Sequence, residues 1–234
     1  MDFSNRIVVV TGGTGALGAA VVGHLITGGA RCIVPYVHAA EAERFAHRGD
    51  KNVTLVSVRD LSDETDVGRV YAEAGAAPWA SIQIAGGFAM GAVADTDRKA
   101  LMAQIDGNLV SCFLCCRAAV NAMLAARQGG RIVNVAARPA LEWRSGAGIS
   151  AYAIAKAGVA VLTTTLAEEV AKDGILVNAV APSIMDTPAN RAAMPKADHA
   201  AWPKVEEVAA TILFLASADN RVTRGAIVPV YGRS

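Results

Sequence analysis

Hydrophobic residues along this chain fall into short runs that alternate with longer segments of helical spacing. The runs predict seven buried β-strands, at residues 7–10, 31–35, 53–58, 81–85, 131–135, 176–180 and 226–230. The segments between them predict helices near residues 15–27, 39–46, 63–74, 97–126, 151–172 and 205–217. Strands that alternate with helices are typical of a parallel sheet covered by crossover helices, so we expect one doubly wound α/β domain over residues 1–234.

One stretch fits neither pattern. Residues 182–203 contain four prolines and show no regular apolar spacing. Prolines interrupt both helices and strands, so this stretch predicts a loop with short helical pieces. We expect a substrate lid around residues 183–203.

The composition narrows the possible partners. The 234 residues are 53% hydrophobic and 18% charged, which excludes a disordered chain. Lys and Arg total 22 and Asp and Glu total 21, for a net charge of +1, and these charges are scattered. Without a basic stripe, neither nucleic acid nor an anionic membrane is an expected partner.

The apolar stretches also bear on location. Arg117 and Lys156 interrupt the longest of them, and none approaches the roughly 18 residues typical of a membrane span. Residues 1–6 lack the basic region and cleavage site of a signal peptide. We therefore expect a cytoplasmic protein that acts on a small-molecule substrate.

Three of the four cysteines lie close together in a predicted helix. Cys112 and Cys115 form a C-x-x-C pair, and Cys116 follows directly. A zinc or redox site is one interpretation, but the four histidines show no paired ligand spacing. Small buried residues of an apolar helix are the favoured interpretation, and we predict no metal.

A glycine-rich turn follows the first predicted strand and leads into a helix. Such a turn lets backbone N–H groups approach a pyrophosphate, which the helix N-terminus stabilises. Strand, glycine-rich turn and helix in this order predict a Rossmann-type dinucleotide site. The expected contacts in the turn are Gly12, Thr14, Gly15, Leu17 and Gly18.

The residues after the second and third strands bear on which dinucleotide binds. A carboxylate at the end of the second strand selects the ribose of NAD, whereas a cation there accepts the 2′-phosphate of NADP. Tyr36 and Val37 supply no acid, and His38 is either a cation for that phosphate or a solvent-facing loop residue. We lean slightly to NADP and leave NAD open. Asp60 is placed to accept a hydrogen bond from the adenine amino group. Helix capping is the alternative interpretation of Asp60, Asp63 and Asp66.

Tyr152 and Lys156 stand four residues apart on one face of a predicted helix. A nearby ammonium favours the phenolate, so it can bring the pKa of a tyrosine from about 10 toward neutrality. Such a phenol serves as a proton donor and acceptor. This pair is the candidate catalytic centre.

With these motifs the sequence resembles the short-chain dehydrogenase/reductase family over essentially its whole length. The matching motifs, in order, are Thr11-Gly12-x-x-x-Ala16-x-Gly18, Asp60-Leu61, Ala85-Gly86, Asn108, Tyr152-x-x-x-Lys156 and the stretch from Asn178 to Ser183. The resemblance implies that Asn108 orders a water and the active-site lysine. It departs from the family at Gln83-Ile84, where Asn-Asn is usual, and at Ser183, where Gly is usual.

The most informative departure is Ala137, which stands where the family has its catalytic serine. Ser145 and Ser150 are the candidate replacements, but Ser145 lies in a glycine-rich loop and Ser150 is placed to cap the helix of Tyr152. Loss of the hydroxyl should slow the reduction of a plain ketone most. It should slow least the reduction of a quinonoid or imine-like acceptor, which delocalises the developing charge.

Dihydropteridine reductases, a branch of that family, show a narrower resemblance. They also carry Ala in place of the serine, have a turn similar to Ala85-Gly86-Gly87-Phe88, and share a lid similar to residues 186–198 and Trp202-Pro203. The acid that those enzymes use after the second strand is absent here.

The resemblance implies the remaining site residues. Further cofactor contacts are expected at Leu61, Ala85, Gly86, Gly87, Pro182, Ile184 and Thr187. Substrate contacts are expected at Ala137, Phe88, Trp143 and Met185, with Met194 and Trp202 as further candidates for an aromatic mouth. Arg138 and Arg191 are candidates for a polar substrate group, or solvated loop charges.

Two further points stay open. A dinucleotide-binding sensor or regulatory subunit is the alternative to an enzyme, because Ala137 and the altered Gln83-Ile84 favour lost activity. Asn108, Tyr152 and Lys156 count against it, since a sensor needs no proton donor.

The small-residue helices at residues 103–126 and 151–172 resemble those through which family members associate, so we expect a homodimer or homotetramer.

Overall fold

The computed structural model describes residues 1–234 and confirms the predicted fold class. Its centre is a seven-stranded sheet in the order β3-β2-β1-β4-β5-β6-β7, and every neighbouring pair is parallel. The strands are β1 (Ile7–Thr11), β2 (Arg31–Tyr36), β3 (Val53–Ser57), β4 (Ala80–Gln83), β5 (Gly130–Val135), β6 (Ile175–Pro182) and β7 (Ile227–Val230). Each lies within a few residues of its predicted position.

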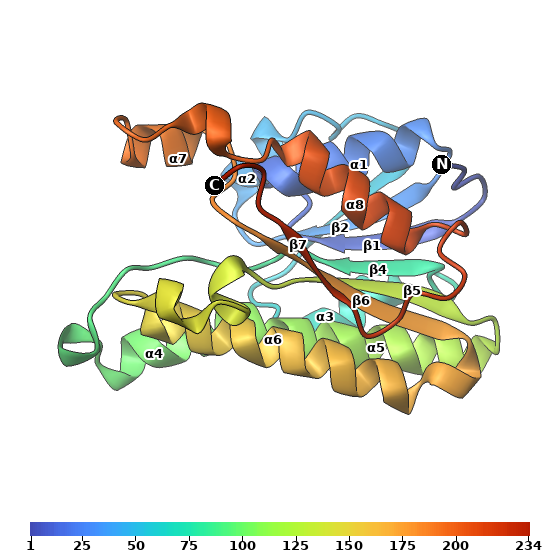
Figure 1. Ribbon diagram of the computed structural model, residues 1–234. Helices are drawn as coiled ribbons and strands as arrows, with labels where there is room; N and C mark the ends of the chain where they lie inside the picture. Colours follow the sequence, from blue (N-terminus) through green and yellow to red (C-terminus); the bar gives the residue numbers. More distant parts are fainter.

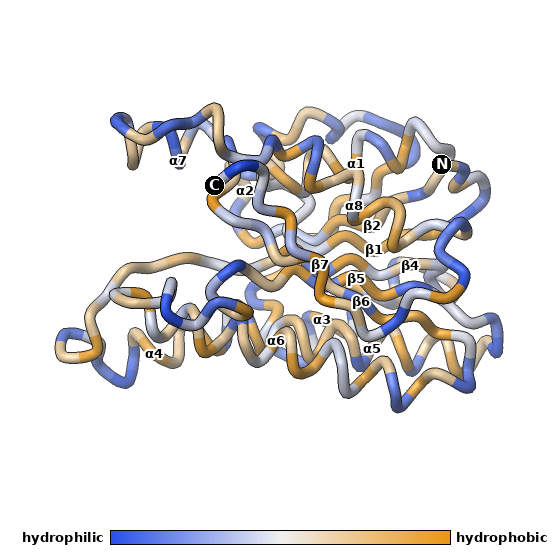
Figure 2. Tube along the Cα trace, in the orientation of Figure 1, coloured by the Kyte–Doolittle hydropathy of each residue, from blue (hydrophilic) through white to orange (hydrophobic).

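Helices cover both faces of this sheet (Figure 1). One face carries α1 (Ala16–Thr27), α2 (Ala39–Arg44) and α8 (Val205–Ala216). The other carries α3 (Glu64–Ala72), α4 (Arg98–Ile105), α5 (Ser111–Ala126) and α6 (Ser150–Glu169). Hydrophobic residues are concentrated on the strands between the two helix layers (Figure 2), because parallel strands are buried on both faces.

The strand order reverses between β1 and β4, which are neighbours in the sheet although β2 and β3 separate them in sequence. In an open α/β sheet, the connections on the two sides of such a point leave to opposite faces and open a crevice at the carboxyl ends of the strands. α4 and α7 (Pro188–Ala193) both project beyond that edge of the sheet (Figure 1). The topology therefore places any ligand site there.

The long predicted helix at residues 97–126 is not uniform. It consists of α4, a π-helical turn at Asp106–Val110, and α5. A π-helical turn inserts an extra residue and is frequent at functional sites. Asn108 lies inside this turn and is buried.

The structure confirms that residues 182–203, where a lid is predicted, form an irregular segment with short helical pieces. After β6 the chain forms α7 and then a single 3₁₀ turn at His199–Ala201 before it enters α8. Thr187 caps α7 by accepting from the backbone N–H of Asn190 at 3.2 Å. Asn190 in turn donates to the carbonyl of Met185 at 2.8 Å, so the segment has its own local order.

The expectation that no apolar segment reaches the length of a membrane span is wrong for two helical segments. Arg98–Ala126 and Ser150–Glu169 are long and apolar enough to cross a membrane by length and composition. In the fold, α5 packs on β4 and β5, and α6 packs on β6. These inward faces account for part of their apolar character, which makes length and composition weak evidence of a membrane span.

All four cysteines are buried and free. Burial raises the pKa of Cys32 to about 12 and holds that of Cys115 far above its usual range. Cys112 and Cys116 belong to the core beneath α5 and α6, and Cys115 to the core beneath α3. Their placement agrees with the favoured interpretation of small packing residues.

Candidate functional site

A cavity of about 210 Å³ lies at the carboxyl ends of β4, β5 and β6. Fourteen residues line it: Leu17, Ile84, Gly86, Gly87, Phe88, Asn108, Val135, Ala136, Ala137, Tyr152, Lys156, Pro182, Ser183 and Met185. Most of them were expected from the sequence as cofactor, catalytic or substrate residues. Fold topology has thus brought together segments that are far apart along the chain.

The glycine-rich turn between β1 and α1 is packed backbone against backbone. Gly12 has a φ of +65°, and a Cβ there would lie 2.7 Å from the backbone nitrogen of Ala85. A Cβ on Gly18 would lie 2.1 Å from the carbonyl oxygen of Gly12. Glycine is therefore required at both positions by the close approach of the chain to itself.

The amino end of α1 is free to bind an anion. Gly15 precedes the helix and contributes no side-chain cap, and the first turn contains no acidic residue. The first N–H groups of a helix lack intrahelical partners and carry partial positive charge. Leu17, in the first turn of α1, lines the cavity, so the amino end of this helix borders the cavity. A pyrophosphate fits this donor set.

A buried polar network lies beneath the turn, and sequence reasoning missed it. Thr11 Oγ1 donates to Gln83 Oε1 at 3.2 Å, and Gln83 Nε2 donates to Ser81 Oγ at 2.7 Å. The phenol of Tyr71 completes the network at 2.6 Å from Ser81 Oγ. Thr11 Oγ1 also accepts from the N–H of Ala85 at 3.2 Å, which joins β1 to the chain after β4. Gln83 thus has a structural role in this network.

Tyr152 and Lys156 lie in the first half of α6 and both face the cavity. Lys156 Nζ is 5.9 Å from the centre of the Tyr152 ring and donates to the carbonyl of Val135 at 2.8 Å. Burial lowers the pKa of Lys156 to about 8 and raises the pKa of Tyr152 to about 12. The expectation that the ammonium brings the Tyr152 pKa toward neutrality is therefore wrong for the protein alone, because desolvation of the phenolate dominates.

Asn108 places an unpartnered acceptor beside this pair. Its Nδ2 donates to the carbonyls of Gly87 at 2.9 Å and Gln104 at 3.0 Å, while its buried Oδ1 has no partner. A Cβ on Gly86 would lie 2.4 Å from that Oδ1 and 3.5 Å from Lys156 Nζ. Glycine at this position is what allows the amide oxygen to approach the chain so closely. The unpartnered Oδ1 is a buried acceptor beside the ammonium, and such groups usually have a partner.

Ala137, two residues after the end of β5, is buried in the cavity wall and supplies no hydroxyl. Neither candidate replacement lines the cavity. Ser145 is exposed and its Oγ donates to the carbonyl of Glu142 at 2.7 Å. Ser150 is the first residue of α6, and Ile149 stands at the cap position without a side-chain bond, so the expected capping role of Ser150 is wrong. The hydroxyl in the wall belongs instead to Ser183, whose Oγ donates to the carbonyl of Tyr231 at 2.9 Å.

The expected aromatic mouth is only partly assembled. Phe88 lines the cavity with its ring edge-on to Tyr152, at 5.1 Å between ring centres, and remains 61% exposed. Met185 also lines the cavity, whereas Trp143 is 79% exposed and lies outside its lining. Trp202 is buried against His199, with 4.6 Å between ring centres, and the carbonyl of Met194 contacts the same imidazole. These last contacts hold the lid together.

Both candidate substrate arginines are engaged in pairs within the chain. Arg138 Nε lies 2.7 Å from Glu142 Oε2, and its guanidinium stacks over the ring of Tyr231 at 5.0 Å. Arg191 forms two bonds with Asp186, at 2.5 and 2.8 Å, which lower the pKa of that carboxyl. Paired guanidinium groups are poor sites for a further anion.

The residues expected to contact the adenosine follow β2 and β3. Tyr36 ends β2 and His38 is an exposed residue before α2. Exposed Asp60 accepts from the N–H and the Oγ of Ser62, at 2.8 and 2.7 Å, while Leu61 is buried in the core. The capping residue of this segment is Asp63, which accepts from the N–H groups of Thr65 and Asp66 at the start of α3.

An acid missed by sequence reasoning lies nearby. Thr14 Oγ1, in the glycine-rich turn, donates to Glu41 Oε2 at 3.4 Å. Glu41 belongs to the first turn of α2 rather than to the end of β2. A search confined to the strand end could not find it, because its position depends on the direction in which α2 leaves the sheet.

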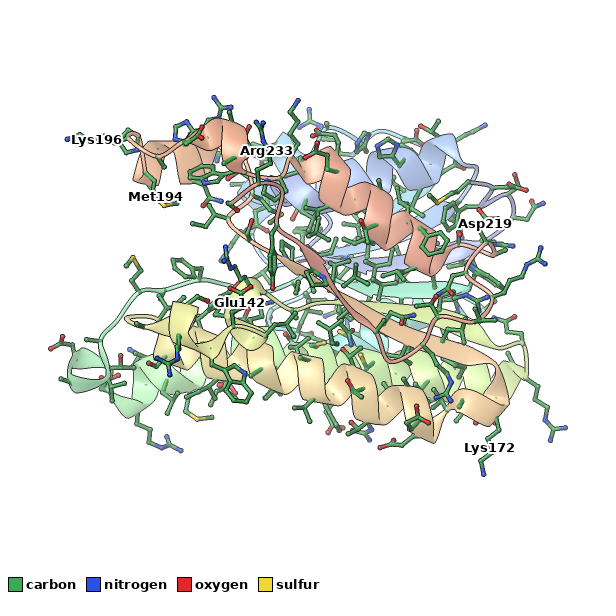
Figure 3. All side chains as sticks on the ribbon, viewed as in Figure 1. Glu142, Lys172, Met194, Lys196, Asp219 and Arg233 are labelled. Atoms are coloured by element: carbon green, nitrogen blue, oxygen red, sulfur yellow. The ribbon has the colours of Figure 1, made fainter.

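The carboxyl terminus ties the lid to the sheet. Arg233 donates from its N–H to the carbonyl of Ala201 at 2.8 Å and from its guanidinium to that of Ala200 at 2.9 Å. Ser234 Oγ contacts Ser183 Oγ at 2.8 Å. Figure 3 shows Arg233 in the C-terminal segment, with Met194 at the end of α7 and Glu142 near the middle of the molecule.

Comparison with known proteins agrees with this geometry. The sequence profile of the family described as short chain dehydrogenase matches residues 6–198. The chain is 30% identical to a (2S)-[(R)-hydroxy(phenyl)methyl]succinyl-CoA dehydrogenase subunit of Thauera aromatica, over 99% of this chain and 97% of that protein. It is 35% identical to a cis-4-hydroxycyclohexanecarboxylate dehydrogenase of Sinomonas cyclohexanicum, over 98% and 96%.

Solved structures give the same result. The fold is similar to an oxidoreductase of the short chain dehydrogenase/reductase family from Burkholderia thailandensis, with a TM-score of 0.86 and 28% sequence identity. The match covers 97% of this chain and 91% of that one. The similarity thus includes the sheet, both helix layers and the segment that contains the lid.

Proposed function

Because the chain belongs to the short chain dehydrogenase family, whose members are oxidoreductases that use nicotinamide dinucleotides, we propose that it is itself an active NAD(P)-dependent oxidoreductase. The observation that carries this proposal is the shared cavity of Tyr152, Lys156 and Asn108 beside the glycine-rich turn. A sensor that only binds a dinucleotide has no need of a buried phenol, ammonium and amide in one wall.

The residues present fit a nicotinamide dinucleotide. Gly12 and Gly18 allow close backbone approach, and the uncapped start of α1 supplies donors for a pyrophosphate. The orphaned Oδ1 of Asn108 and the nearby ammonium of Lys156 are polar groups that a ribose or an ordered water satisfies. When bound, the dinucleotide supplies or accepts a hydride.

Tyr152 is the proposed proton donor and acceptor. Its raised pKa keeps the phenol protonated at neutral pH, which suits delivery of a proton to a reduced substrate. Lys156, with a pKa of about 8, is mainly charged at neutral pH and holds a hydrogen bond to the carbonyl of Val135. In this scheme Asn108 contributes by positioning a polar group between its Oδ1 and the ammonium.

The wall at Ala137 limits the substrates. Ala137 supplies no hydroxyl, and Ser183 Oγ already donates to the carbonyl of Tyr231, so Tyr152 is the sole proposed donor to an oxyanion. An acceptor that delocalises its developing charge, such as a quinonoid or imine-like ring, depends less on a second donor. The exposed ring of Phe88 beside Tyr152 suits stacking on such a flat group. The narrower likeness to dihydropteridine reductases supports the same substrate class.

We also propose that the protein works in the cytoplasm as a homodimer or homotetramer. Large apolar side chains remain exposed on the outer faces of α5 and α6, among them Phe113, Ile154 and Val161. Exposed apolar residues on two adjacent helices are typical of a self-association surface. The same surface explains why both helices have the composition of a membrane span.

The test compares the purified protein with its Tyr152→Phe variant. Nicotinamide absorbance is followed with NADH or NADPH and a panel of quinonoid pterins, quinones and ketones. We expect turnover with the quinonoid acceptors and a loss of about 10²-fold to 10⁴-fold in the variant, since a general acid contributes that much. Dinucleotide binding, followed by nicotinamide fluorescence, should persist.

Two results would contradict the proposal. Turnover that is unchanged in Tyr152→Phe removes the proposed proton donor. Dinucleotide binding without oxidation of NADH or NADPH across the whole panel favours the sensor.

A further inference from the structure

Glu41 brings an unpaired carboxylate to the glycine-rich turn. Its Oε2 accepts from Thr14 Oγ1 at 3.4 Å, across 27 residues of sequence. Thr14 is half-buried within the turn, and Glu41 is exposed in the first turn of α2. Since β2 and β1 are neighbours in the sheet, the segment after β2 and the turn after β1 meet at the same edge.

The charges around Glu41 leave it uncompensated. None of the six ion pairs in the molecule includes it, so no cation lies within 4.0 Å of its carboxylate. Arg44, in the last turn of the same helix, forms no ion pair with Glu41. Arg48, which follows this helix, donates to the carbonyl of Glu43. His38 at the start of α2 is exposed and makes no side-chain cap.

A carboxylate in this position discriminates between ribose substituents. It accepts hydrogen bonds from hydroxyl groups, and a single bond to Thr14 leaves most of its lone pairs available. A phosphate dianion at the same place meets a like charge instead, which is unfavourable even near the surface. The slight preference for NADP predicted from the sequence was based on residues 36–38 alone, so it did not take the carboxylate of Glu41 into account.

We infer that Glu41 selects the unphosphorylated adenosine ribose, so that this protein prefers NAD(H) to NADP(H). The inference rests on the proposed function, since it assigns a specificity to the same dinucleotide site. Glu41 here replaces an acid at the end of β2, where Tyr36 stands.

The test measures binding rather than turnover. Dissociation constants for NADH and NADPH are obtained from nicotinamide fluorescence, and 5′-ADP and 2′,5′-ADP serve as competitors that differ only in the 2′-phosphate. We expect the wild-type protein to bind NADH about tenfold more tightly than NADPH, the size of a like-charge interaction near a protein surface. Raising the salt concentration should shrink that ratio by screening.

Glu41→Gln separates charge from shape, because glutamine still accepts a bond from Thr14. The variant should bind NADPH several-fold more tightly and bring the two dissociation constants close together. The matched control is Glu43→Gln on the same short helix, which removes the same charge and should leave the ratio unchanged. A merely structural tether between Glu41 and Thr14 predicts no change in the ratio for Glu41→Gln.

Two outcomes overturn the inference alone: a wild-type protein that binds NADPH as tightly as NADH, or a ratio that is the same in Glu41→Gln and wild type. Failure of both dinucleotides and both competitors to bind overturns the proposed function as well. The two failures are therefore distinguishable in a single titration series.

Discussion

The two segments that border the cavity, the glycine-rich turn that leads to Leu17 and the lid that begins at Ser183, are held in place in different ways. On the side of the glycine-rich turn, backbone atoms approach backbone atoms so closely that Gly18 has no room for one more carbon. On the side of the lid, the contacts are hydrogen bonds between residues 231–234 and either Ser183 or Ala201: Ser183 Oγ donates to the carbonyl of Tyr231, and Arg233 and Ser234 donate to Ala201 and Ser183. The first segment depends on shape, whereas the second depends on a few polar contacts that are partly exposed to water.

This difference suits the two ligands of the proposed reaction. A dinucleotide has one fixed shape, and a close-packed turn preorganises its binding. Substrates vary, and segments held by few exposed bonds open at low free-energy cost.

The largest expected effect tests the close packing of the turn. Gly18→Ala places a Cβ 2.1 Å from the carbonyl oxygen of Gly12, so the backbone must move. We expect a loss of about 3 kcal/mol or more in the free energy of unfolding, together with loss of dinucleotide binding. Chemical denaturation and nicotinamide fluorescence measure the two effects.

The matched control lies three residues away. A Cβ on Gly15 has its nearest neighbour at 3.4 Å, which is an ordinary contact, and the backbone there is extended. Gly15→Ala should cost about 1 kcal/mol or less, mainly through the weaker capping of α1. Equal losses in the two variants would show that the turn is not limited by packing.

The second effect concerns Lys156, which lines the cavity. Burial shifts the pKa of Lys156 from 10.5 to about 8, so between these pH values the unfolded chain binds more protons than the folded one. Stability from this group therefore rises as pH increases from about 8 to 10.5 and is lowest below pH 8. Lys156→Met removes the titration, and its stability relative to wild type should fall by about 3 kcal/mol over that interval.

Urea denaturation of both proteins at a series of pH values measures this difference. The hydrogen bond from Lys156 to Val135 adds a constant difference between the unfolding free energies of the two proteins, which does not change with pH below the pKa of Lys156. The raised pKa of Tyr152 makes the folded state lose stability only above pH 10, in both proteins. Parallel stability curves for the two proteins would contradict the buried ammonium.

The smallest effect tests the lid side. Deleting residues 232–234 removes the bonds of Arg233 to Ala200 and Ala201 and that of Ser234 to Ser183. We expect a several-fold rise in KM for the reducible substrate, little change in kcat, and a stability loss of about 1–2 kcal/mol. Dinucleotide binding should stay within twofold or so of wild type, because the glycine-rich turn does not contact this segment. A drop in kcat at constant KM would instead place the tail among the residues of the chemical step.

Much of the fold could be predicted because its signals are local. Each strand is an apolar run, and the switch from strand to helical spacing locates every major element within a few residues. The position of the cavity follows from the same pattern, since parallel strands place their carboxyl ends at one edge. Gly12, the first residue after β1, was found in this way, whereas Gly86 and Ala137 were found through the resemblance to a family.

The missed features depend on contacts between distant segments. Glu41 meets Thr14 only because α2 folds back over the glycine-rich turn, and Gln83 meets Tyr71 only through the packing of α3 and β4. Trp143 shows the reverse case, since a residue expected in the cavity is directed to solvent by the 3₁₀ turn that contains it. No residue spacing reports these directions.

The sequence by itself determined the parallel sheet, the glycine-rich turn and the pairing of Tyr152 with Lys156, because periodicity, backbone freedom and helical spacing are properties of neighbouring residues. Only the tertiary structure decided the pKa shifts of that pair and the presence of a carboxylate at the glycine-rich turn. Burial sets the pKa values of about 12 and about 8, and the course of α2 sets the place of Glu41. Desolvation and electrostatic contact depend on what surrounds a group in space, and the order of residues does not state this.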